Sequence, residues 1–177
     1  MKNATSYHLK LAAEKGYTLI ELLLYMAIVG VLLTSVTTFF GMTADARFKN
    51  QTVAEVNDQG QAMMDYMTQT IRNATSITTP VAAASGASLT LVVPTGSLSP
   101  TVFSLSSSAL QVKEGAAAAI SLTNNDVQVN SISFTNLTRS GTSGVVQISF
   151  VLARVNVNSH NEFDYQKTFT DTAEIGW

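Results

Sequence analysis

Hydrophobic and polar positions divide the chain into stretches of different periodicity. Residues 1–15 are mostly polar, whereas residues 16–40 are almost continuously apolar, with Glu21 as the only acidic or basic side chain. From residue 53 to residue 74 apolar side chains recur every three or four positions, which indicates the buried face of an amphipathic helix. Beyond residue 77 short apolar runs alternate with turn residues, a pattern typical of β-strands.

The predicted amphipathic helix has one well-defined apolar face. The face consists of Val53, Val56, Gly60, Met63, Met67, Ile71 and Ala74. Pro80 and the threonines before it end the helical pattern. We expect the cluster of Met63, Met64 and Met67 to pack in the core, because methionine fills gaps there and no His or Cys lies nearby to suggest a metal site.

The C-terminal part predicts an antiparallel sheet. Strands are expected at residues 89–93, 102–105, 110–113, 127–134, 145–157 and 163–175. Short turns between consecutive strands favour one antiparallel meander with one face on the helix. The predicted fold class is therefore α+β: a long N-terminal helix, half transmembrane and half amphipathic, packed on an antiparallel β-sheet head.

The apolar run is long enough to cross a bilayer as a helix, which takes about 20 residues. Lysines before it favour a cytoplasmic N-terminus. A secretory signal has an apolar core of about 7–15 residues followed by a small-residue cleavage site, but this run is longer and no such site lies near Phe40. A plain membrane anchor leaves Glu21 unexplained, because a carboxylate inside an apolar segment costs about 2.5 kcal/mol or more.

The segment Lys15-Gly16-Tyr17-Thr18-Leu19-Ile20-Glu21-Leu22 resembles the class III leader of type IV prepilins and pseudopilins. In that family a membrane peptidase cuts after the glycine and methylates the new N-terminus. The resemblance implies cleavage between Gly16 and Tyr17, and N-methylation of Tyr17. The family usually has phenylalanine at this first mature position, so Tyr17 departs from its pattern.

The resemblance also implies roles for the charged residues on both sides of the cut. Lys10 and Lys15 are basic residues of the leader, together with Lys2, and Glu21 becomes the fifth mature residue and an assembly residue. The new amine of Tyr17 on one subunit would be the partner of Glu21 on a neighbour. A buried acid that faces an ammonium group costs much less than an isolated one, so this pair would set the register of assembly.

The implied function is a structural subunit, a minor pilin, of a type IV pilus-like filament. The order of elements in the head resembles minor pilins and J-type pseudopilins. The expected domains are a leader at 1–16, a transmembrane and filament-core helix at 17–41, an amphipathic helix half at 42–76 and a β head at 77–177. Expected partners are other pilin or pseudopilin subunits, the prepilin peptidase and methyltransferase, the inner-membrane assembly platform and membrane lipid.

The expected location is the inner membrane as a single-pass protein with its N-terminus inside, and afterwards an extracellular or periplasmic filament. Three alternatives remain open. The first is a pseudopilin of a type II secretion system. The second is a monomeric membrane-anchored binding domain, which would be neither processed nor dependent on Glu21. The third is a tethered enzyme, which would need a polar pocket around His160.

Composition argues against several other classes of function. Cysteine is absent, so no disulfide or thiolate chemistry is possible. The formal net charge is -2, and the head carries few bases, namely Lys113, Arg139, Arg154 and Lys167. We therefore expect no nucleic-acid binding. We also expect no catalytic residues, no cofactor and no metal, because His8 in the leader and His160 in a loop cannot complete a zinc set.

Overall fold

The computed structural model describes residues 16–157 and 160–176. Contacts divide the chain into two compact units, one up to Thr43 and one from Ala44 onward. Helix α1 (Leu19–Arg72) contributes to both of them. Its N-terminal part is the helix of the first unit, and its C-terminal part is the first element of the second unit.

In the first unit, α1 is apolar and exposed on every side. The helix contains an 18-residue window of mean hydropathy 2.3, so by length and composition it can cross a membrane. Threonine and serine side chains interrupt the apolar surface, and each of them on this part of the helix donates a hydrogen bond to the carbonyl four residues earlier. These donors are Thr34, Ser35, Thr37, Thr38 and Thr43, at 2.7 to 2.9 Å. The hydroxyl protons are thus satisfied within the helix, as an apolar environment requires.

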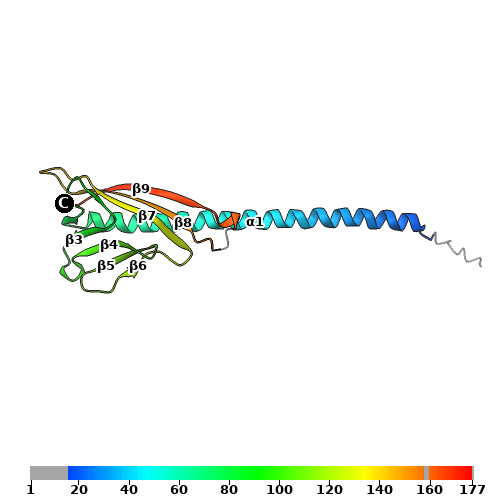
Figure 1. Cartoon of the computed structure of the whole chain (residues 1–177), viewed down its shortest axis with the longest axis horizontal. Helices are drawn as coiled ribbons and strands as arrows, with labels where there is room; N and C mark the ends of the chain where they lie inside the picture. Colours follow the sequence, from blue (N-terminus) through cyan, green and yellow to red (C-terminus); the bar gives the residue numbers. More distant parts are fainter. Residues whose placement is uncertain (1–15, 158–159, 177) are drawn as a thin grey trace, which may run out of the picture. The chain divides into compact units, whose positions relative to one another are not determined.

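The second unit contains two antiparallel sheets rather than the single meander that we predicted (Figure 1). One sheet has the order β1-β3-β4-β5-β6, with β1 (Ser76–Thr79), β3 (Leu89–Val92), β4 (Thr101–Ser106), β5 (Ala109–Glu114) and β6 (Ile120–Ser121). The other has the order β2-β7-β8-β9, with β2 (Ser85–Gly86), β7 (Val127–Asn136), β8 (Val145–Arg154) and β9 (Gln166–Glu174). Short 3₁₀ helices occur at η1 (Gly96–Leu98) and η2 (Asn161–Phe163).

The chain passes between the sheets more than once: β2 lies between β1 and β3 in sequence but pairs with β7, and from β7 onward all strands belong to the second sheet. Consecutive strands pair from β3 to β6 and again from β7 to β9, so the predicted hairpins are present within each sheet. The prediction of one continuous meander was wrong, because the segment around Asn124–Asp126 turns the chain away from β6 and into the second sheet. Strands β1, β2 and β6, which have four, two and two residues, were not predicted.

Helix α1 packs against both sheets. The ring of Tyr66 lies edge-on to Phe103 of β4, with ring centroids 6.1 Å apart. On the other side, Gly60 faces the ring of Phe169 in β9, which stacks on Phe150 of β8 at 5.2 Å. The apolar face predicted from the sequence is confirmed, because Val56, Gly60, Met63, Met67, Ile71 and Ala74 are buried. Val53 lies at its margin and is half-buried.

The packing at Gly60 gives a test of this arrangement. A Cβ atom at residue 60 would collide with the Phe169 ring, and the stack with Phe150 restricts how far that ring can move. Overpacking costs about 1–3 kcal/mol, which should exceed the gain in helix propensity of about 1 kcal/mol for replacing glycine by alanine. We therefore expect Gly60→Ala to lower the midpoint of chemical unfolding, followed by near-ultraviolet circular dichroism.

The matched control is Gly41→Ala, because an added Cβ there has nothing within 4 Å. This variant should leave the midpoint unchanged or raise it slightly. Equal midpoints for the two variants would contradict the close contact between α1 and β9.

Candidate functional site

The first site is built at the N-terminal end of α1, where Thr18 caps the helix. The Glu21 N–H donates to Thr18 Oγ1 at 3.3 Å, and the Leu22 N–H donates to the Thr18 carbonyl at 3.1 Å. The Thr18 side chain thus satisfies one backbone donor that the first turn of a helix leaves without a partner, and its carbonyl accepts the first hydrogen bond within the helix. The helix therefore begins at Leu19, directly after a threonine whose side chain can accept such a bond.

The predicted cleavage position lies just before this cap. Gly16 and Tyr17 are exposed and precede the helix in chain without regular structure. A peptide bond in such a segment can extend into the active site of a peptidase, whereas a helical one must first unwind. The leader lysines Lys10 and Lys15 lie outside the described residues.

The Glu21 carboxylate lies on the outer surface of the apolar helix. Tyr25 Oη donates to Glu21 Oε1 at 3.4 Å, and the ring of Tyr17 meets the ring of Tyr25 edge-on, with centroids 6.3 Å apart. Glu21 is half-buried, while the other residues from 16 to 42 are exposed. The sequence analysis missed Tyr25, although its spacing of four residues from Glu21 places both on one helix face.

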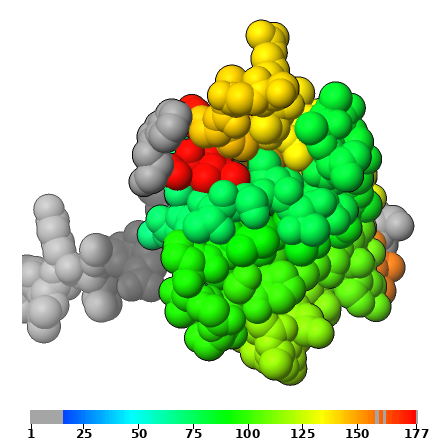
Figure 2. Space-filling model, turned by 90° about the vertical axis from the view of Figure 1, so that its left-hand side faces the viewer, coloured from blue at the N-terminus to red at the C-terminus, as the bar shows by residue number. Residues whose placement is uncertain are grey.

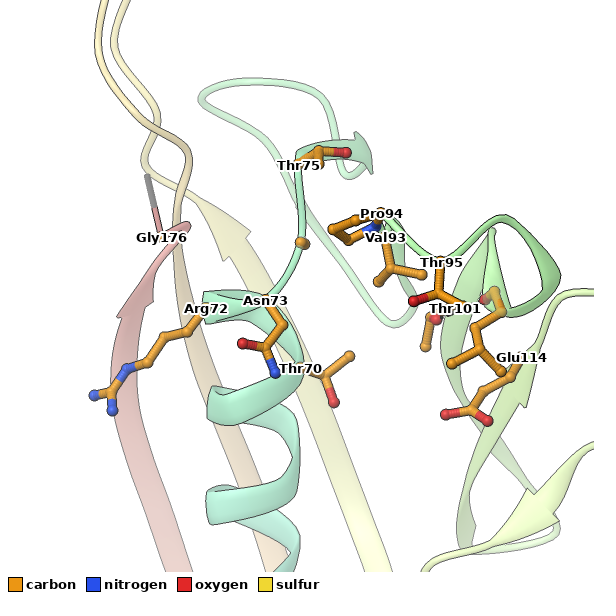
Figure 3. A pocket seen from close by; sticks show the side chains of 12 residues that line it. Thr70, Arg72, Asn73, Thr75, Val93, Pro94, Thr95, Thr101, Glu114 and Gly176 are labelled. Carbon is orange, nitrogen blue, oxygen red and sulfur yellow. Dashed lines mark hydrogen bonds between the residues drawn. The ribbon is translucent and has the colours of Figure 1, made fainter.

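The second candidate is an open pocket of about 810 Å³ at the C-terminal end of α1. In Figure 3, Asn73 and Thr70 form one wall, Glu114 and Thr101 come from the opposite wall, and the Arg72 side chain extends away from them. Tyr66 Oη donates to Glu114 Oε1 at 3.0 Å. Seen from this end, the connection between β7 and β8 projects from the rest of the unit (Figure 2).

The histidine and the bases singled out in the sequence are spread over the second unit. His160 is exposed, and its backbone N–H donates to Asn156. Arg154 forms an ion pair with Asp126 at 3.2 Å, and Lys167 donates to Asn57 at 2.6 Å. Among residues 16–157 and 160–176, no group of three or more His, Cys, Asp or Glu side chains could hold a metal ion. Of the predicted site residues, Gly16, Tyr17 and Glu21 lie together at the N-terminal end of α1.

Comparisons with known proteins bear on the same end of the chain. Residues 11–37 match the family model of the prokaryotic N-terminal methylation motif. Neither the curated proteins nor the solved structures gave a significant match. The matched segment contains Gly16, Tyr17, Glu21 and Tyr25, and it leaves the second unit without a related sequence or structure in these comparisons.

The pair of Tyr66 and Glu114 predicts a pH dependence. Burial, the hydrogen bond to Glu114 and the nearby carboxylate charge raise the pKa of Tyr66 above its usual value of 10.0. A raised pKa in the folded state means that the native protein holds this proton more tightly than the unfolded chain. The associated stability is present below pH 10 and should be lost as the pH rises through the raised pKa.

Urea unfolding of the protein in detergent micelles at pH 8 and pH 11 measures this effect. We expect Tyr66→Phe to lose less stability between these pH values than the wild type does. Glu114→Gln, which keeps the shape of the acceptor and removes its charge, should reduce the loss as well. Identical losses in all three proteins would contradict the assignment.

Proposed function

We propose, on the premise that this chain carries the N-terminal methylation motif of prepilins and pseudopilins, that it is a minor pilin of a type IV pilus-like filament. The motif supports a pilin-like or pseudopilin-like subunit processed by prepilin peptidase. The finer assignment to a minor pilin is our own. Its support is the resemblance of the sequence of the head to minor pilins and J-type pseudopilins.

The observation that carries the proposal is the acid at residue 21 on an otherwise apolar helix. Large apolar side chains on all sides of this helix are exposed, among them Leu23 at 59%, Leu32 at 58% and Phe39 at 67%. Such a surface needs lipid or another protein around it. A carboxylate is costly in either environment unless a cation meets it. An N-terminal amine created by cleavage after Gly16 would supply that cation from a neighbouring subunit.

The proposed sequence of events follows from these requirements. The leader at 1–16 keeps the N-terminus in the cytoplasm, supported by Lys10 and Lys15. The segment 17–41 holds the subunit in the inner membrane and later forms the filament core, where lipid gives way to the helices of other subunits. The helix half at 42–76 and the head at 77–177 face outward. The peptidase and methyltransferase act first, and the inner-membrane assembly platform then moves the subunit into the filament.

Processing at Gly16 is the first expected outcome. The N-terminal residue of the native protein, measured by intact mass and peptide sequencing, should be N-methylated Tyr17. Gly16→Val should leave a polypeptide that still starts at Met1, because a branched side chain would occupy the position before the cut. Gly30→Ala, a glycine substitution within the apolar helix that follows the cut, should be processed normally. A wild-type protein that starts at Met1 would overturn the proposal.

Assembly through Glu21 is the second expected outcome. Glu21→Ala should be processed normally but should reach sheared filaments at a level about tenfold or more below the wild type, because removal of one partner from a buried charge pair costs about 2–5 kcal/mol. Asp45→Ala, which removes an acid from the same helix outside the apolar run, should assemble normally. Quantitative immunoblots of filament and membrane fractions measure both. Normal incorporation of Glu21→Ala would refute the role of this carboxylate.

A further inference from the structure

The geometry points to Tyr25 as a positioning residue for assembly. Its hydroxyl group holds the Glu21 carboxylate away from the N-terminus of its own chain, so that the carboxylate is available to the amine of a second copy. This inference rests on the proposed function, in which Glu21 meets the N-terminal amine of a neighbouring subunit. It adds a residue that selects between an intrachain and an intersubunit partner.

The sequence gives Glu21 an intrachain alternative. Thr18 and Glu21 have the spacing of a capping box, in which a threonine at the helix cap is followed three residues later by a glutamate. In a complete capping box the glutamate side chain reaches back to the backbone N–H of the capping residue. After cleavage, that N–H group lies one residue from the amine of Tyr17. A Glu21 that completed the box would therefore lie next to the amine of its own chain.

The structure contains only half of this capping box. The Glu21 N–H donates to Thr18 Oγ1 at 3.3 Å, which is the half made by the threonine. The carboxylate instead accepts from Tyr25 Oη at 3.4 Å, one turn further along the helix. Among the described residues this is the hydrogen bond that the carboxylate makes, so it draws the side chain toward the C-terminus.

The contact leaves Glu21 able to accept another donor. An ionised carboxylate has two oxygens with about four acceptor positions, and the Tyr25 hydroxyl occupies one position on Oε1. A phenol is a neutral donor, so it supports the carboxylate in an apolar environment without cancelling its charge. The charge therefore remains available for an ammonium group from outside the chain.

The aromatic contact fixes the position from which this hydroxyl donates. The rings of Tyr17 and Tyr25 meet at an interplanar angle of 81°, an edge-to-face arrangement that aromatic pairs favour. The first mature residue thus braces Tyr25, and Tyr25 in turn directs Glu21. A carboxylate that is paired with the amine of its own chain gains little from the amine of a neighbour. This arrangement therefore favours pairing between one subunit and the next.

Association of the mature, full-length protein in detergent micelles tests the inference. The chain has no cysteine, so a single cysteine at exposed Ser140 can carry donor or acceptor dyes, and energy transfer between the two labelled pools reports association. We expect Tyr25→Phe, which keeps the ring and removes the hydroxyl, to weaken association about tenfold, as loss of a hydrogen bond to a charged group does. Thr37→Val is the matched control, because it also removes a hydroxyl group from the apolar helix, but one that donates to the Leu33 carbonyl of the same helix. This variant should associate like the wild type.

A double-variant cycle separates positioning from packing. In a Glu21→Ala background, Tyr25→Phe should cause no further weakening, because the hydroxyl acts only through the carboxylate. A further loss of the same size would show that Tyr25 acts by packing, and it would overturn the inference. Unchanged association of Tyr25→Phe alone, together with weak association of Glu21→Ala, would overturn the inference while leaving the proposed function intact. If Glu21→Ala itself associated like the wild type, the proposed charge pair would fail first.

Discussion

The structure of the first unit depends on one constraint, which is the carboxylate of Glu21 on an otherwise apolar helix. The side chains of α1 in the first unit are exposed on all sides, so they must be covered by lipid or by other helices. Both environments raise the cost of the Glu21 charge. Thr18 caps the helix and Tyr25 contacts the carboxylate, but neither provides a positive charge. Neither residue therefore neutralises the carboxylate, and a positive charge from another molecule can stabilise it without a large polar interface.

The second unit has no disulfide to stabilise it, because the chain contains no cysteine. Its core consists of the C-terminal part of α1 between two sheets. Phe103 contacts the helix from one sheet, and Phe150 and Phe169 contact it from the other. The absence of a side chain at Gly60 lets Phe169 lie directly against the helix backbone. The C-terminal part of α1 is thus held in this unit by apolar packing against both sheets.

The sequence was informative wherever a pattern is local. Periodicity predicted the helix and its buried methionines, Met63, Met64 and Met67, and all three lie in the core. The longer strands also lie close to their predicted positions. The division into two sheets could not be predicted, because it depends on which strands pair across long separations, as β2 does with β7. The bond between Tyr66 and Glu114 joins residues 48 positions apart, whereas the contact between Glu21 and Tyr25 could have been found from their spacing on one helix face.

The hydroxyl groups of the apolar helix affect how it responds to lipid and to protein surroundings. Each of five hydroxyl groups donates its proton to a carbonyl of the same helix, namely those of Thr34, Ser35, Thr37, Thr38 and Thr43. If protein replaces lipid around this segment, no hydrogen bond therefore forms or breaks at these positions. At these positions the segment therefore has no hydrogen-bonding preference for lipid over protein, so its preference between the two is left to packing and to the Glu21 carboxylate.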